Sequence, residues 1–280
     1  MIDVSQLETS GKVYVPYPSE LRTAVLEAEL AWEDFCSLPD ETKLRFPYEP
    51  DTKQSGNGYE CKRAKGALLD QKENFHLRLS ARNELMDCAL AMPEPEVADF
   101  IQKALALPYL IEPLLLEFAQ GIEERYAVAG FVDAVAFTKP ELFIRFLHYF
   151  GECSPGDEIA VPHIDKGGFT LHLYESDGGV EQLSLDKEQW VPMPLSHNET
   201  VIFPSLGLQQ YLGSRVKALC HRVVATPECA ASGRFSAVCF VDFKGARHYD
   251  KARHGRLQNF PAGFNYDMPA DQFDDLFVCP

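Results

Sequence analysis

The second half of the chain most constrains the fold, because it consists of short β-like runs separated by Gly, Pro and Asn. Five such runs follow Glu141, and each is rich in β-branched and aromatic residues. No helical pattern long enough to join parallel strands lies between them, so βαβ crossovers are excluded. The pattern predicts an antiparallel sandwich or jelly roll. The runs are LFIRFLHYF (142–150), FTLHLY (169–174), TVIFP (200–204), HRVVAT (221–226) and RFSAVCFV (234–241).

The first half of the chain is expected to be rich in helices. Apolar residues recur at helical spacing from Ser19 to Cys36, and Ser19 is placed to cap the first turn. A second periodic stretch, from Glu96 to Tyr126, is interrupted by Pro108 and Pro113, which predicts two or three helices.

Residues 55–79 lie between these helical stretches and resemble short strands joined by polar loops. The whole chain is therefore expected to be a single domain, 1–280, of the α+β class and mainly β. A helix-rich N-terminal support region, 1–130, would carry a jelly-roll core, 131–280, with flanking helices. No internal repeat or interdomain linker is evident.

Composition limits the partners. The formal net charge of −16 repels phosphate backbones, which argues against nucleic acid and favours a small-molecule partner. No apolar run is long enough to cross a bilayer, and the N-terminus lacks the basic and apolar regions of a secretory signal. We therefore expect no membrane partner and a cytoplasmic location. Eight cysteines without a CxxC pair are expected to be reduced thiols, and the sequence leaves the oligomeric state open.

Three residues form a candidate metal site. His163 and Asp165 are separated by one residue in VPHIDKGG, so on an extended backbone both side chains leave the same face. His221 opens another predicted strand, which a jelly roll could bring against the first two residues. Two imidazoles and one carboxylate on one side of an octahedron leave three positions open, as in non-haem Fe(II) oxygenases. The alternative is a hydrogen-bonded loop pair beside an unrelated strand histidine.

The last predicted strand carries a candidate anion site. In RFSAVCFV, Arg234, Ser236, Val238 and Phe240 share one face, because side chains alternate along a strand. A planar guanidinium with a hydroxyl beside it suits a carboxylate. The alternative is an exposed arginine on an edge strand.

On these motifs the chain resembles the isopenicillin N synthase-like family of Fe(II)/2-oxoglutarate dioxygenases, whose pattern is HxD, a distal His and RxS. The likeness extends from GKVYV through GNGYE, IRFLHYF and GGVEQLSLDKEQWVPM to RFSAVCFVDF. It implies that His163, Asp165 and His221 bind Fe(II), and that Arg234 and Ser236 hold the distal carboxylate of 2-oxoglutarate. Fe(II), 2-oxoglutarate and O2 would be the cofactor and co-substrates.

The resemblance implies two further details of the site. Tyr149 matches a family tyrosine that contacts the co-substrate, and Leu147 replaces an Asn that many plant members carry two residues before it. Asp165 argues against halogenation, because related halogenases have Gly or Ala there. The expected reaction is oxidation of a small molecule with release of succinate and CO2. Hydroxylation is the expected outcome, with desaturation or cyclisation as alternatives.

Candidate substrate contacts flank the matched motifs or share a strand face with them. Plain core packing and, for Arg145, a structural ion pair are the alternatives. The candidates are Tyr59, Phe75, Arg145, Leu147, Phe240 and Phe243.

Rival functions remain open at this point. An oxidase of the same family would use the iron without 2-oxoglutarate, and a non-catalytic jelly roll would retain the motif without turnover. Zn(II) on the same ligands would give hydrolysis but leaves the Arg and Ser without a role. A thiol hydrolase using Cys220 and His221 is disfavoured, because adjacent strand residues point to opposite faces.

Overall fold

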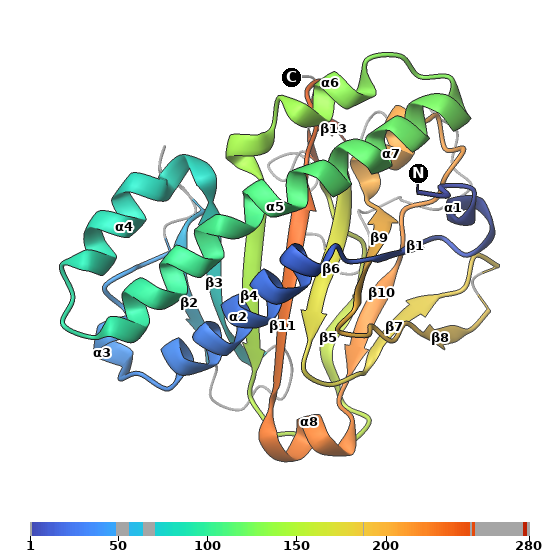
Figure 1. Ribbon diagram of the computed structural model, residues 1–280. Coiled ribbons are helices and arrows are strands. Elements are labelled where there is room, and N and C mark those ends of the chain that lie inside the picture. Colours follow the sequence, from blue (N-terminus) through green and yellow to red (C-terminus); the bar gives the residue numbers. More distant parts are fainter. Residues whose placement is uncertain are drawn as a thin grey trace.

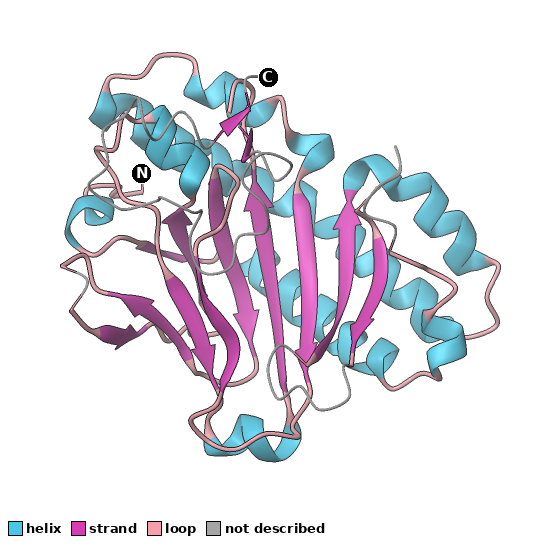
Figure 2. Cartoon of the chain, turned by 180° about the vertical axis from the view of Figure 1, so that it is seen from behind, coloured by secondary structure: helices cyan, strands magenta, loops and turns pink. Residues whose placement is uncertain are grey.

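A computed structural model of the chain describes residues 2–48, 56–63, 71–186, 188–246, 248–249 and 277–278. A seven-stranded and a four-stranded sheet dominate it, with a small two-stranded sheet beside them (Figures 1 and 2). Every ladder between the described strands is antiparallel. The predicted mainly β jelly roll with flanking helices is confirmed.

The large sheet runs in the order β1-β9-β6-β11-β4-β3-β2, and the small one in the order β5-β10-β7-β8. The N-terminal part of the chain is rich in helices and also supplies β1, β2 and β3 of the large sheet. The strands of the large sheet are β1 (Val13–Pro16), β9 (Glu199–Pro204), β6 (Phe169–Glu175), β11 (Arg234–Val241), β4 (Phe143–Tyr149), β3 (Lys72–Arg78) and β2 (Gly58–Lys62). Those of the other sheets are β5 (Glu158–His163), β10 (His221–Val224), β7 (Val180–Leu183), β8 (Trp190–Pro192), β12 (His248–Tyr249) and β13 (Phe277–Val278).

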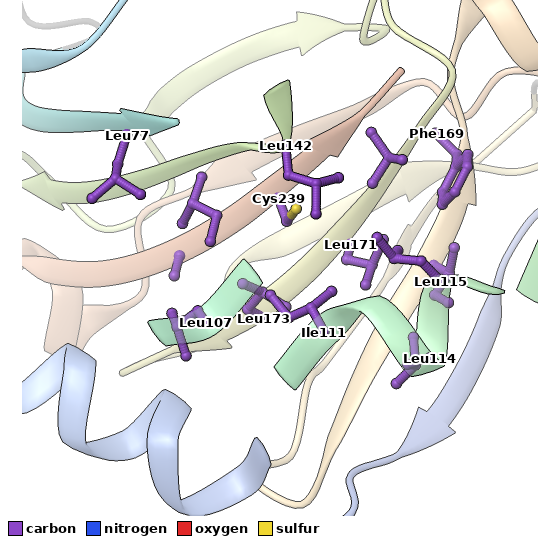
Figure 3. Close-up of a cluster of buried hydrophobic side chains, with 14 of the residues drawn as sticks. Leu77, Leu107, Ile111, Leu114, Leu115, Leu142, Phe169, Leu171, Leu173 and Cys239 are labelled. Carbon is purple, nitrogen blue, oxygen red and sulfur yellow. The ribbon is translucent and has the colours of Figure 1, made fainter. Parts of the chain in front are cut away.

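Helices α2 (Ser19–Cys36) and α5 (Pro95–Tyr126) lie across one face of the large sheet (Figure 1). Leucine and isoleucine side chains of α5 face the apolar side chains of the strands, among them Leu77, Leu171 and Cys239 (Figure 3). This face therefore forms the main core, and the opposite face is left to build a cavity. The remaining helices are α1 (Gln6–Thr9), α3 (Asp40–Lys43), α4 (Arg82–Leu90), α6 (Phe131–Ala136), α7 (Leu206–Tyr211) and α8 (Pro227–Ser232), with 3-10 turns η1 (Leu79–Ala81) and η2 (Lys139–Glu141).

Helix α5 corrects two expectations. It is one helix of 32 residues with Pro108 and Pro113 inside it, not two or three helices. Each proline costs about 3 kcal/mol in a helix, but each large apolar side chain that α5 buries, such as Phe100 or Phe118, contributes about 1.5–3 kcal/mol.

The second expectation was that no segment could cross a membrane. By length and composition α5 is long and apolar enough to do so. The core helix of a globular protein has the same length and composition, and 56% of the most apolar window of α5 is buried against the rest of the protein.

The predicted cap of α2 was also wrong. The helix begins at Ser19, Pro18 is its N-cap residue, and no side chain accepts a hydrogen bond there. The Pro18 carbonyl instead accepts from the Arg22 backbone N–H at 2.9 Å. The first turn is therefore stabilised by the backbone and by the preset φ of proline.

Candidate functional site

A cavity of about 890 Å³ lies between the two main sheets. Its walls come from β4, β6 and β11 of the large sheet and from β5 and β10 of the small one. The cavity-facing residues of β11 are Arg234, Ser236, Val238 and Phe240, as the alternation of the sequence predicted. The intervening Ala237, Cys239 and Val241 belong to the main core.

His163, Asp165 and His221 meet at this cavity. His163 ends β5, His221 begins β10, and the two residues are register partners with ring centroids 4.2 Å apart. Asp165 follows β5, and its Oδ1 lies 3.8 Å from His163 Nε2. Potential ligand atoms of all three residues lie within 4.8 Å of one another. The structure therefore assembles the three residues that the sequence singled out.

Each of the three side chains is oriented by a hydrogen bond on the atom that faces away from the group. His163 Nδ1 donates to the Val161 carbonyl at 2.8 Å, and His221 Nδ1 donates to the Leu219 carbonyl at 3.3 Å. A carbonyl can only accept, so Nδ1 carries the hydrogen in both rings and Nε2 keeps a free lone pair. Asp165 Oδ2 accepts from Thr170 Oγ1 at 2.6 Å, which leaves Oδ1 on the side of His163.

The turn after Asp165 requires glycine. A Cβ on Gly168 would lie 2.7 Å from the Val241 carbonyl and from the Phe243 ring. The Gly168 N–H also donates to Asp242 Oδ1 at 3.1 Å. The close approach to the end of β11 therefore fixes the loop that carries the carboxylate.

The histidines are prepared to bind a cation. Burial, helped by the neighbouring His221, lowers the pKa of His163 to about 4, so its ring is neutral near pH 7. The Nε2 atoms of two imidazoles and one carboxylate suit Fe(II), and their placement on one side leaves room in the cavity for further ligands.

A second cluster of potential metal ligands is filled by the protein itself. Cys36, Glu73 and His148 also place ligand atoms within 4.8 Å of one another. However, Glu73 accepts hydrogen bonds from Lys43 Nζ at 2.9 Å, Tyr59 Oη at 2.6 Å and His148 Nδ1 at 2.8 Å. The Lys43 ammonium already supplies the positive charge. We call this group the Glu73 cluster and assign it a structural role.

Arg234 lies at one end of the cavity face of β11 and is 1% exposed. Its Nη2 donates to Glu175 Oε2 at 2.6 Å, and its Nε lies 2.9 and 3.0 Å from the carbonyl oxygens of Asp177 and Gly178. Within the described part of the chain, Nη1 has no partner, so part of the guanidinium fork remains for a ligand. No sequence pattern indicated Glu175, which orients this arginine.

The neighbours of Arg234 complete the anion site. Tyr149 is its register partner on β4, and the guanidinium carbon lies 6.0 Å from the centre of the Tyr149 ring. Ser236 Oγ lies 3.2 Å from His172 Nε2. Burial, and next the charge of Arg234, lowers the pKa of His172 to about 3, so this ring adds no charge. His172 was not among the predicted site residues, although its alternation with Thr170 on a strand places both on one face.

Three of the candidate substrate contacts line the cavity: Arg145, Leu147 and Phe240. Tyr59, Phe75 and Phe243 do not, and all three lie in the main core. Tyr59 pairs with Phe75, which pairs with the core residue Phe146, so this row faces the helices. Phe243 lies two residues after Val241 and, like Val241, belongs to the main core. The prediction that these three residues contact substrate was wrong, because it was based on their closeness to the motifs in the sequence and not on the face of the sheet to which they point.

Comparison with known proteins shows which proteins this fold and site resemble. Residues 143–242 match the family model of the 2OG-Fe(II) oxygenase superfamily. The 2-oxoglutarate-dependent dioxygenase eupC of Phoma sp. is 26% identical over 187 residues, which are 60% of this chain and 59% of eupC, so the match spans less than two thirds of that relative. The dioxygenase tropC of Talaromyces stipitatus is 24% identical over 80% of this chain and 73% of tropC.

Solved structures show the same fold. A full-length protein of Neurospora crassa, in complex with alpha-KG and thymine, superposes with a TM-score of 0.69 at 18% identity, over 98% of this chain and 88% of that protein. A putative 2OG-Fe(II) oxygenase family protein of Caulobacter crescentus gives 0.68 at 22% identity, over 97% of this chain and 90% of that protein. Residues 143–242 of the chain are therefore similar to the 2OG-Fe(II) oxygenase superfamily, and the chain resembles curated 2-oxoglutarate-dependent dioxygenases. Fe(II), 2-oxoglutarate and O2 are the cofactor and co-substrates of this family.

Proposed function

We propose that this chain oxidises a small molecule with Fe(II) and 2-oxoglutarate, and that His163, Asp165 and His221 hold the iron. The convergence of two free Nε2 lone pairs and one carboxylate oxygen on the cavity carries the proposal. When bound, Fe(II) activates O2 while 2-oxoglutarate is decarboxylated to succinate and CO2. Hydroxylation of the substrate is the expected outcome.

The protein's own residues position the reactants. Arg234 Nη1 and Ser236 would hold the distal carboxylate of 2-oxoglutarate, while Glu175 keeps the guanidinium in place. Leu147, Val238 and Phe240 form apolar walls that exclude water and orient a C–H bond. A cavity of about 890 Å³ is large enough for 2-oxoglutarate and a small second molecule.

The relatives' names favour this function over the rival functions. Two of them are named as 2-oxoglutarate-dependent dioxygenases, so an oxidase that omits the co-substrate is not favoured. The expected small-molecule substrate is supported by thymine in the Neurospora crassa complex, which is a fact about that protein alone.

The test measures O2 consumption and succinate formation with Fe(II) and 2-oxoglutarate, using a panel of small metabolites. We expect both signals to rise with substrate and to vanish in Asp165→Ala. Asp99→Ala, an exposed aspartate on α5, is the matched control and should behave as wild type. Substrate oxidation that proceeds without 2-oxoglutarate would contradict the proposal.

A further inference from the structure

The cavity carries an excess of positive charge in an acidic protein. The formal net charge of the chain is −16. Apart from the iron and co-substrate residues, the cavity is lined by five basic residues and only two acidic ones among the described residues. Such a cavity attracts an anion. The basic residues are Lys62, Lys72, Arg78, Arg145 and Lys166, and the acidic ones are Glu141 and Asp242.

Arg145 differs from Arg78 and Lys62 because no carboxylate among the described residues compensates its charge. Arg78 lies 3.8 Å from a Glu141 oxygen, and Lys62 lies 3.5 Å from Glu60. Within the described ranges, Arg145 forms no ion pair with a carboxylate, although its side chain is half-buried. A partly desolvated guanidinium without a counter-ion is costly, and a bound anion would remove that cost.

The contacts of Arg145 hold it in place without neutralising it. Its Nε donates to His76 Nδ1 at 3.4 Å, a long hydrogen bond between register partners. His76 is stacked between the rings of Tyr48, with centroids 4.1 Å apart, and Phe143, at 5.5 Å. Its Nε2 lies 3.4 Å from Glu60 Oε2, while burial lowers its pKa to about 4. A neutral His76 can therefore accept from Arg145, and as far as the described residues go, both terminal amino groups of the guanidinium are left for a ligand.

Aromatic rings flank the guanidinium. Its carbon lies 5.3 Å from the centre of the Phe143 ring and 5.0 Å from that of Phe240, and the two rings are 5.6 Å apart. Together with Leu147 and Val238 they form an apolar wall beside the charge. A ligand that fits has one anionic group and an apolar or aromatic body.

The strand register places Arg145 away from the proposed co-substrate site but within reach of the proposed iron site. Arg145 pairs with Val238, four residues along β11 from Arg234, which corresponds to about 13 Å along the strand. Thr170, which holds Asp165, lies on β6, and β6 and β4 flank β11, so they are about 10 Å apart across the sheet. An anion at Arg145 can therefore place carbon atoms of a small molecule toward the iron site without displacing 2-oxoglutarate.

We propose that the substrate is a small carboxylate with an apolar or aromatic body, and that Arg145 binds its carboxylate. The planar guanidinium offers a two-pronged fit to a carboxylate, and its uncompensated charge matches the single charge of the ligand. The assignment of this ligand as the substrate rests on the proposed function. The site itself can be tested by binding alone.

The experiment is anaerobic calorimetry on the chain loaded with Fe(II) and 2-oxoglutarate. The probes are trans-cinnamate and 2-naphthoate, their uncharged primary amides, and phenyl phosphate. We expect at least one carboxylate to bind about 10-fold or more tightly than its amide, since a charge-assisted hydrogen bond is lost in the amide. Arg145→Ala should abolish this preference, and Arg145→Lys should keep only part of it.

The affinity for 2-oxoglutarate in Arg145→Ala shows whether the variant is folded, because Arg234 is untouched. The inference is overturned if no carboxylate binds more tightly than its amide, if Arg145→Ala keeps the preference, or if phenyl phosphate binds most tightly. A preference for carboxylates in a protein that does not bind 2-oxoglutarate would support the Arg145 site and contradict the proposed function, so the two failures are distinguishable.

Discussion

Two clusters in this protein contain histidine and a carboxylate at similar spacing, but only one of them is open. In the Glu73 cluster the carboxylate accepts hydrogen bonds from Lys43, Tyr59 and His148. In the candidate iron site, His163, Asp165 and His221 use their outer atoms for hydrogen bonds and keep the inner ones free.

The difference shows that proximity of ligand atoms does not define a metal site. In both groups the potential ligand atoms lie within 4.8 Å of one another. In the Glu73 cluster the buried carboxylate is paired with the Lys43 ammonium, whereas the candidate iron site borders the cavity. Metal binding is predicted by ligand atoms whose lone pairs face a cavity and are not used in hydrogen bonds.

The largest effect is expected from Glu73→Ala. This change removes the buried carboxylate partner of the Lys43 ammonium and leaves it only the exposed Asp40 carboxylate, which should lower the free energy of unfolding by up to about 3–5 kcal/mol. Denaturant unfolding of the variant and the wild type measures this loss. Glu73→Gln, which keeps part of the hydrogen bonding, should lose less. An unchanged unfolding free energy in Glu73→Ala would show that the cluster is not structural.

Acid should reproduce part of that effect. Burial raises the pKa of Glu73, but the hydrogen bonds from His148, Tyr59 and Lys43 outweigh it and lower the pKa to about 2. The stabilisation is therefore fully present above the unfolded-state pKa near 4.5 and is lost as the pH falls toward 2, up to about 3 kcal/mol. Unfolding measured between pH 6 and about 3 should show this loss in the wild type and a smaller one in Glu73→Gln. Equal slopes would contradict the assignment.

Asp165→Ala should weaken Fe(II) binding by about 100-fold or more, because even outer-sphere changes at metal sites cost 10- to 100-fold. Anaerobic titration with Fe(II), followed by metal analysis, measures the affinity. Glu73→Gln is the control from the other cluster and should bind Fe(II) as the wild type does. Loss of Fe(II) binding in Glu73→Gln but not in Asp165→Ala would show that the Glu73 cluster, and not His163, Asp165 and His221, binds the metal.

The smallest effect is expected from Ser236→Ala. The hydroxyl would contribute one hydrogen bond to the distal carboxylate, so the affinity for 2-oxoglutarate should fall by about 10-fold. Calorimetry on the Fe(II)-loaded variant measures this change, and Thr23→Ala, at an exposed position of α2 that does not line the cavity, serves as the control. No change in Ser236→Ala would remove Ser236 from the co-substrate site.

Sequence alone predicted the features that depend on local alternation. The cavity face of β11 followed from the period of a strand, and the jelly roll followed from short antiparallel runs. The sequence motifs also singled out His163, Asp165 and His221, and the structure brings these three residues together. Their role as iron ligands stays a prediction until binding is measured.

Features that depend on contacts between distant elements were not predicted. Glu73, Lys43, Tyr59 and His148 come from β3, α3, β2 and β4, so no local pattern reveals their network. Glu175, which orients Arg234, was missed for the same reason. The continuity of α5 depends on burial against the sheet, which outweighs the local preference of proline to end a helix.

Anaerobic calorimetry of 2-oxoglutarate binding to the Fe(II)-loaded protein tests the central claim most directly. We predict saturable binding to the wild type, none without metal or in Asp165→Ala, and strongly weakened binding in Arg234→Ala. If folded, Fe(II)-loaded wild type does not bind 2-oxoglutarate, the assignment of this cavity to 2-oxoglutarate-dependent oxidation is contradicted.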